Sequence, residues 1–144
     1  MRPGPRTLRR ARERALQALF QIENAGDDWQ ESLDLFWRDR PTAPAARNYA
    51  TALVTGTIEN REQIDSLISR VADKWTLKRI GAVERNILRF ATQEMVFMPD
   101  VPPKVVINEA VEVAKKFGAD EAGRFVNGIL DAIKGMLERG EIDR

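Results

Sequence analysis

The sequence predicts an all-α fold, and three observations support that prediction. Apolar residues recur at steps of three and four along most of the 144-residue chain, which is the spacing of a helix face. No segment shows the alternating pattern of a half-buried strand. The prolines cluster between the periodic segments, where helices are expected to begin and end. We expect one domain, residues 1–144, with subdomains at about 8–75 and 76–139.

The first half of the chain contains three predicted helices behind a flexible arm at residues 1–7. The first helix is expected to run to about Gly26, and its apolar face consists of Leu8, Ala11, Ala15, Ala18, Leu19 and Ile22. A short helix follows and ends before Pro41. From about Ala45 a single long helix is predicted to reach a joint at residues 73–76, with Gly56 kept for close packing.

The second half contains three more predicted helices. An amphipathic helix is expected after Gly81. Pro103 fits the first turn of the next helix, where its missing N–H costs nothing, and Gly118 ends that helix. Asp120 is predicted to cap the last helix. The sequence therefore predicts six main helices, and one further turn at residues 76–80 stays open.

Positive charge is concentrated at the start of the chain. Six of the first fourteen residues are arginine, namely Arg2, Arg6, Arg9, Arg10, Arg12 and Arg14. Only Glu13 opposes them there, whereas the remaining 130 residues carry 17 basic and 21 acidic side chains. Guanidinium groups hold phosphate oxygens bidentately and stack on bases, so this excess favours a nucleic-acid partner. A solvated helix face explains the same charge equally well.

The composition disfavours catalysis. The chain has no cysteine and no histidine, which removes thiol chemistry, the usual zinc ligands and the commonest general base. It also has no glycine-rich phosphate-binding motif. We therefore expect a binding protein without a cofactor, and a carboxylate-bound magnesium ion is the alternative left open. There is no run of 18 apolar residues and no secretory signal, so we expect a cytoplasmic protein without a membrane partner.

Several positions allow both a structural and a functional interpretation. Glu94 lies on the apolar face of its helix, and we favour a packing role in which it accepts backbone N–H bonds from the start of the next helix over an acid–base role. Phe125, beside Arg124, either stacks on a base or fills the rim of the core. Asn127 either bonds a neighbour or faces a ligand, and Gly128 is expected to allow close helix approach.

Three stretches together resemble the bacterial NusB family of transcription antitermination factors. Residues 9–23 (RRARERALQALFQIE) are similar to the family's first helix, and residues 83–95 (VERNILRFATQEM) to a later helix. The most specific stretch is residues 100–131 (DVPPKVVINEAVEVAKKFGADEAGRFVNGILD), which resembles the family's C-terminal signature almost throughout. The likeness spans the chain, with residues 27–75 the least distinctive.

The resemblance implies two three-helix bundles and a non-enzymatic function. That function is binding single-stranded boxA RNA with the ribosomal protein NusE, alongside the RNA polymerase elongation complex and other Nus factors, to support transcription of ribosomal RNA operons. The implied RNA-binding residues are Arg9, Arg10, Arg12, Glu121, Arg124, Phe125 and Asn127. The implied NusE-binding residues are Phe20, Glu84 and Arg89. Lys78 and Arg79 stand where some members are acidic. Some relatives form homodimers, so a homodimer stays open.

Two other functions compete with this one. The chain could be a helical protein-interaction domain whose arginine face is only solvated. It could also be the RNA-binding module of an RNA methyltransferase, because a NusB-like domain precedes the catalytic part of some of these enzymes. We expect the chain to end too soon after the helical signature to hold a methyltransferase sheet.

Overall fold

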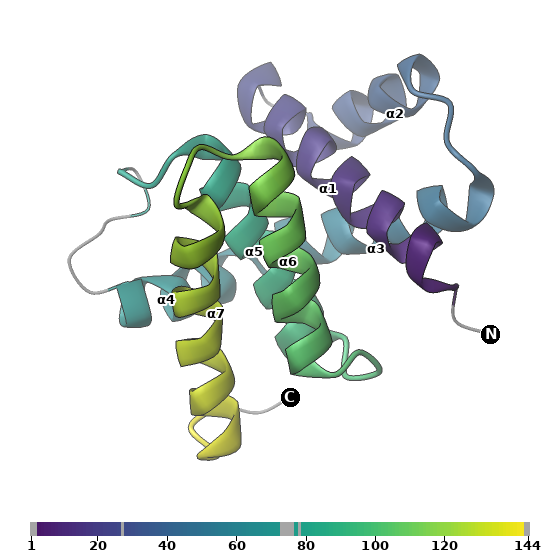
Figure 1. The fold of residues 1–144 in the computed structure, drawn as a ribbon. Coiled ribbons are helices and arrows are strands. Elements are labelled where there is room, and N and C mark those ends of the chain that lie inside the picture. The colour runs from purple at the N-terminus through teal and green to yellow at the C-terminus, as the bar shows by residue number, and fades with distance from the viewer. Residues whose placement is uncertain (1–2, 27, 73–76, 78, 143–144) are drawn as a thin grey trace.

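The protein is all-helical in a computed structural model that describes residues 3–26, 28–72, 77 and 79–142 (Figure 1). The seven helices of these residues are α1 (Pro5–Ala25), α2 (Trp29–Asp39), α3 (Pro44–Glu59), α4 (Arg61–Ala72), α5 (Ala82–Phe97), α6 (Pro103–Phe117) and α7 (Ala122–Glu138). The described residues contain no strand, so the predicted fold class is confirmed. The joint predicted at residues 73–76 lies outside the described residues.

Two boundaries differ from the prediction. The long helix expected from Ala45 is two helices, because the chain bends at Asn60, which has φ −103° and ψ 16°. The Asn60 side chain donates a hydrogen bond to Gln93 on α5, 3.0 Å away, and asparagine is a weak helix former. At the N-terminus α1 already begins at Pro5, so residues 5–7 are helical and do not belong to a flexible arm.

α5 forms the centre of the core. It contacts α1, α3, α4, α6 and α7, and every side chain from Asn86 to Val96 is buried. In Figure 1 α6 and α7 run side by side, and α1 crosses close to the end of α6 that leads into α7. This arrangement brings the arginine-rich helix next to the α6–α7 connection, although the two are about 100 residues apart in the chain.

The glycine predictions had opposite outcomes. A Cβ atom on Gly56 would lie 2.1 Å from Nε2 of Gln93, so the predicted close packing of α3 on α5 is confirmed. The same prediction for Gly128 is wrong, because a Cβ there would meet no atom within 4 Å. The close approach between α6 and α7 occurs instead at Gly123, where a Cβ would lie 3.3 Å from Cγ of Lys115.

None of the described helices is both long enough and apolar enough to cross a bilayer.

Candidate nucleic-acid interface

The core contains a charged cluster that includes one of the predicted RNA-binding residues. The Arg12 guanidinium donates to the Glu94 carboxylate through Nε at 2.9 Å and Nη2 at 2.7 Å, and the Tyr49 hydroxyl donates to the same carboxylate at 2.6 Å. Arg12 is only 2% exposed and Glu94 is fully buried. Burial opposes the charge on Arg12, but its bonds and attraction to Glu94 outweigh this and raise the pKa of Arg12.

This cluster corrects two predictions. Glu94 has a packing role, as we favoured, but its partners are Arg12 and Tyr49 side chains and not the backbone at the start of α6. The predicted direct contact between Arg12 and RNA does not hold for this structure, because the guanidinium is enclosed and already bonded on two sides. Arg12 instead fixes α1 against α5 through Glu94, and thereby fixes the position of the exposed arginines on α1.

Arg9 and Arg10 lie on the surface, and each is paired with a carboxylate. The Arg9 side chain is 53% exposed and donates to Glu109 of α6 through Nε at 3.0 Å and Nη2 at 2.8 Å. These bonds lower the pKa of Glu109, and burial of the carboxylate opposes the shift. The Arg10 side chain is 55% exposed, and its Nη1 lies 3.5 Å from Oε1 of Glu13. Both guanidiniums therefore keep N–H groups that face solvent.

Glu13 connects the arginines of α1 to the end of α6. Besides Arg10 it accepts a hydrogen bond from Lys116, whose Nζ lies 3.0 Å from Oε2. Lys116 belongs to the last turn of α6, two residues before Gly118. Glu13 therefore brings Arg10 of α1 and Lys116 of α6 together beside the corner at Gly118, where α6 ends.

The start of α7 completes this corner. Arg124 and Asn127 are exposed, and the Arg124 guanidinium lies 3.3 Å from the Glu121 carboxylate. Glu121 has φ 74°, which makes it the non-glycine residue with a left-handed backbone among those described. This residue, and not Asp120, directly precedes α7, and its side chain makes no cap hydrogen bond. A left-handed conformation costs a non-glycine residue about 1–3 kcal/mol and is frequent at functional sites.

Phe125 is half-buried and lines a hollow of about 380 Å³ between α5 and the α6–α7 connection. Glu121, Arg79 and Glu84 also line this hollow. The Glu84 carboxylate lies between two glycines, since a Cβ on Gly81 would come within 2.6 Å of Oε2 and one on Gly118 within 3.3 Å of Oε1. The hollow therefore joins a residue implied in NusE binding to two implied in RNA binding.

The other residues implied in NusE binding lie in unlike environments. The Phe20 side chain, late in α1, is 45% exposed, which is unusual for a large apolar residue. Arg89 is buried and donates to Asp65 of α4 through Nε at 2.8 Å and Nη2 at 3.1 Å. Arg89 therefore joins α5 to α4, and it also lines a hollow with Glu23, Arg61 and Arg85, so its contact with a partner stays a prediction. Lys78 lies outside the described residues.

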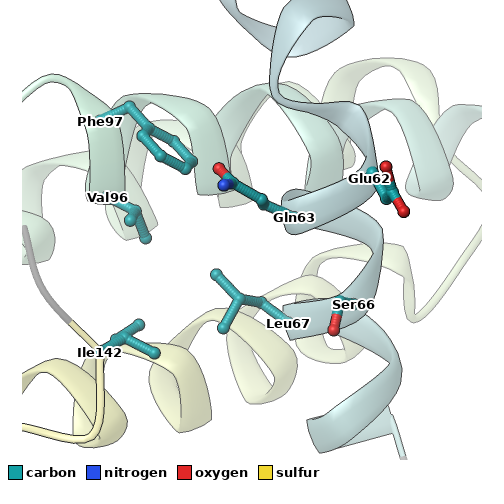
Figure 2. Close-up of a pocket in the computed structure, with 7 residues that line it drawn as sticks. All are labelled: Glu62, Gln63, Ser66, Leu67, Val96, Phe97 and Ile142. Atoms are coloured by element: carbon teal, nitrogen blue, oxygen red, sulfur yellow. The ribbon is translucent and has the colours of Figure 1, made fainter.

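A second hollow, of about 670 Å³, has different chemistry. It lies between α4, the end of α5 and the C-terminal tail, and Figure 2 shows the apolar side chains of Leu67, Val96 and Ile142 facing its centre. Its described lining contains one carboxylate, Glu62, and no lysine or arginine. From Glu84 to this end, α5 advances about 20 Å at about 1.5 Å per residue. The second hollow is therefore remote from the cations near Gly118. Because its described lining holds no cation, it does not suit a phosphate.

Sequence reasoning gave Glu109 a packing role but did not pair the acidic residues at this corner with their cations. Glu109 pairs with Arg9 and also lies 3.6 Å from Arg12, while Glu13 holds Arg10 and Lys116. The Arg10–Glu13 pair was detectable, because residues three apart are neighbours on a helix. The Arg9–Glu109 pair joins residues 100 apart in the chain, and no local pattern in the sequence indicates it.

Known proteins are similar to this chain both in sequence and in fold. The NusB family model matches residues 9–134. The transcription antitermination protein NusB of Sorangium cellulosum is 41% identical over 133 residues, which cover 92% of this chain and 95% of that protein. The solved structure of T. maritima NusB is 38% identical, with a TM-score of 0.83, and the match covers 99% of this chain and 100% of that chain.

A structure of a complex is also similar. In the crystal structure of antitermination factors NusB and NusE in complex with double-stranded RNA, the matching chain is 30% identical, with a TM-score of 0.80 and coverage of 92% of this chain and 98% of that chain. The family match and the relatives cover nearly the whole sequence. The chain therefore belongs to the NusB family.

Proposed function

We propose that the chain is a non-enzymatic transcription antitermination factor that acts in the cytoplasm and binds RNA at one corner of the fold. This RNA corner consists of Arg9, Arg10, Lys116, Glu121, Arg124, Phe125 and Asn127. One observation carries the proposal: Glu13 of α1 binds both Arg10 and Lys116, which brings exposed cations of α1 and α6 together two residues before the connection that leads to Glu121, Arg124 and Phe125. The relatives named transcription antitermination protein NusB, and the similar complex with NusE and RNA, support it.

The corner offers two kinds of contact. Arg9 uses Nε and Nη2 for Glu109, so its remaining N–H groups stay available for a phosphate oxygen, and Glu109 orients them. Phe125 lines the hollow, and an unpaired base that enters the hollow can stack against its ring. Phosphate contacts supply affinity for any sequence, whereas the stacking and the amide of Asn127 select unpaired bases. Arg12 acts indirectly, by holding α1 in place.

The proposed RNA is a single-stranded boxA-like element, and NusE is the proposed protein partner. The exposed Phe20 and the Glu84 carboxylate in the hollow beside Phe125 are the proposed NusE contacts. Because Glu84 and Phe125 line one hollow, NusE and RNA are expected to bind next to each other. Retention of the protein on immobilised NusE should therefore increase when boxA RNA is added, and Phe20→Ala should reduce retention with and without RNA.

Fluorescence anisotropy with labelled RNA at several salt concentrations tests the RNA site. Each phosphate contact to a single strand adds about 0.7 to the slope of log K against log salt. Arg9→Gln combined with Arg10→Gln should therefore reduce the slope by about 1.4, while Phe125→Ala should weaken binding by about 1–3 kcal/mol with little change in slope. The matched control is Arg70→Gln, which removes an exposed arginine on α4.

Three RNAs complete this experiment: boxA-like, scrambled and fully duplexed. We expect the boxA-like strand to bind most tightly. If none of the three binds, the chain is a protein-interaction domain and the RNA site is refuted. If Arg70→Gln lowers the slope as much as the arginine pair does, RNA binds but not at the proposed corner.

A further inference from the structure

We propose that the protein has a second RNA-binding surface, which continues from the RNA corner along a row of arginines and holds the single strand that flanks the primary element. The arginine row consists of Arg6, Arg10, Arg14 and Arg40, and it runs along α1 to the α2–α3 connection. This inference rests on the proposed function, because Arg10 belongs both to the RNA corner and to the row.

The first part of the row follows from helix geometry. Arg6, Arg10 and Arg14 are four residues apart on α1, and residues at this spacing share a face with Cβ atoms about 5–6 Å apart. This face lies opposite the buried stripe that contains Leu8, Ala11 and Ala15. α1 therefore presents three successive cations along its length on the side away from the core.

Hydrogen bonds link Arg14 on α1 to Arg40 in the α2–α3 connection. Arg14 donates through Nε to the Thr42 hydroxyl at 3.0 Å, and that hydroxyl donates to the Arg40 carbonyl at 2.9 Å. Arg14 also donates through Nη1 to the Gln17 side chain at 2.8 Å. Thr42 and Gln17 are uncharged, so these bonds position the Arg14 guanidinium without neutralising it.

Aromatic rings hold the cations at the end of the row. The Arg40 guanidinium carbon lies 5.1 Å from the centroid of the Phe36 ring. Arg47 of α3, also exposed, lies 5.6 Å from the centroid of the Trp37 ring. An arginine stacked on a ring uses its face and keeps the N–H groups of its edge for a planar oxyanion.

The row differs from the RNA corner in its charge balance. Within the described part of the chain, neither Arg14 nor Arg40 has a carboxylate within 4.0 Å, whereas Arg9, Arg10 and Lys116 all do. Burial lowers the pKa of Arg14, the positive charges of Arg10 and Arg40 lower it further, and the smaller effect of the Glu13 carboxylate opposes them. Arg14 and Arg40 thus add positive charge to the row that no described carboxylate offsets within 4.0 Å, and a ligand with regularly spaced negative charges would neutralise it.

The ligand that fits is RNA backbone. A single strand has one charge per nucleotide, it can leave the RNA corner in either direction, and Arg10 provides a continuous path from the corner to the row. An acidic protein segment is the competing ligand, but it would have no connection to the ligand of the corner.

The test compares a short RNA that fills only the corner with the same RNA lengthened by six nucleotides at its 5′ or its 3′ end. For the unmodified protein, one of the two longer RNAs should bind several-fold more tightly than the short one. Its slope of log K against log salt should be steeper by about 1.4, for two added phosphate contacts. Arg14→Gln with Arg40→Gln should abolish this gain and leave the affinity for the short RNA unchanged.

Two further variants keep the result interpretable. Arg14→Lys with Arg40→Lys retains both charges and should retain most of the gain. Arg70→Gln with Lys104→Gln removes two exposed cations elsewhere and should retain all of it. Thermal melting of each variant shows whether it is folded, and the comparison is made below the lowest melting temperature.

The outcomes are separable. If the short RNA binds but neither extension adds affinity or slope, the row is overturned while the RNA corner stands. If the control variant loses the gain as well, the effect is one of overall charge and the row is again overturned. In a third outcome, a poly-glutamate peptide binds the unmodified protein but not the Arg14→Gln, Arg40→Gln variant, and RNA length has no effect on affinity. The ligand of the row is then an acidic protein, and the RNA proposal for the row is overturned. If the short RNA does not bind at all, both proposals fail.

Discussion

Replacing Arg12 by methionine should strongly destabilise the fold, because it leaves the Glu94 carboxylate buried without its cation. Glu94 is fully buried, and Arg12 supplies two of its hydrogen bonds, at 2.9 and 2.7 Å. Removing one partner of a buried ion pair costs about 3–5 kcal/mol. Proteins of this kind are stable by about 5–15 kcal/mol, so the loss is a large fraction of the total. At about 3 °C per kcal/mol, the melting temperature should fall by about 10 °C.

Urea unfolding followed by circular dichroism measures this effect. The double variant Arg12→Met, Glu94→Leu removes both charges, so it should regain most of the lost stability, apart from about 1–3 kcal/mol for the loss of the hydrogen bond from Tyr49 to Glu94. We therefore expect the double variant to be more stable than Arg12→Met alone. The reasoning is refuted if the free energy of unfolding of Arg12→Met lies within about 1 kcal/mol of that of the unmodified protein. It is also refuted if the stability losses of Arg12→Met and Glu94→Leu simply add in the double variant. At a temperature where Arg12→Met is folded, its RNA salt slope should be unchanged.

Three other predictions concern the fold and the corner. Gly56→Ala should destabilise the protein by about 1 kcal/mol, because displacing the Gln93 amide costs more than the gain in helix propensity. Gly128→Ala has open space around the new Cβ and should stabilise the protein by up to about 1 kcal/mol. Thermal melting of the two variants should therefore show shifts of opposite sign. The pKa of the Glu109 carboxyl is lower in the folded state than in the unfolded chain. Its contribution to stability is therefore complete above about pH 4.5 and is lost as the pH falls further. Urea unfolding at several pH values should show that Glu109→Gln flattens the acidic part of the curve of stability against pH. Glu109→Gln should also bind RNA more tightly at low salt in anisotropy titrations, because it removes a negative charge beside the phosphate site, and an unchanged affinity would contradict this.

Helix positions were largely predictable, because amphipathic spacing and proline boundaries are local properties. The break at Asn60 was not, since it depends on a hydrogen bond to Gln93, 33 residues away. Glycine within a helix was equally ambiguous. Gly56 and Gly128 look alike in the sequence, yet one faces a neighbouring side chain and the other faces solvent.

The candidate site was predictable in its location but not in its chemistry. The arginine excess and the family resemblance both pointed to α1, and Arg9 and Arg10 are indeed exposed. Neither signal distinguished Arg12, because its burial depends on where Glu94 lies after folding. A charged residue on a helix face can be a surface group or half of an internal ion pair, and only the tertiary structure separates the two.

Cross-linking locates the bound RNA directly. A boxA-like RNA that contains 4-thiouridine should cross-link to peptides from the first three turns of α1 and from the α6–α7 connection through Asn127. No cross-link should form to α4 or to the tail around Ile142, which line the remote hollow. Cross-links confined to α4 and that tail would contradict the assignment of the RNA site to α1, α6 and α7.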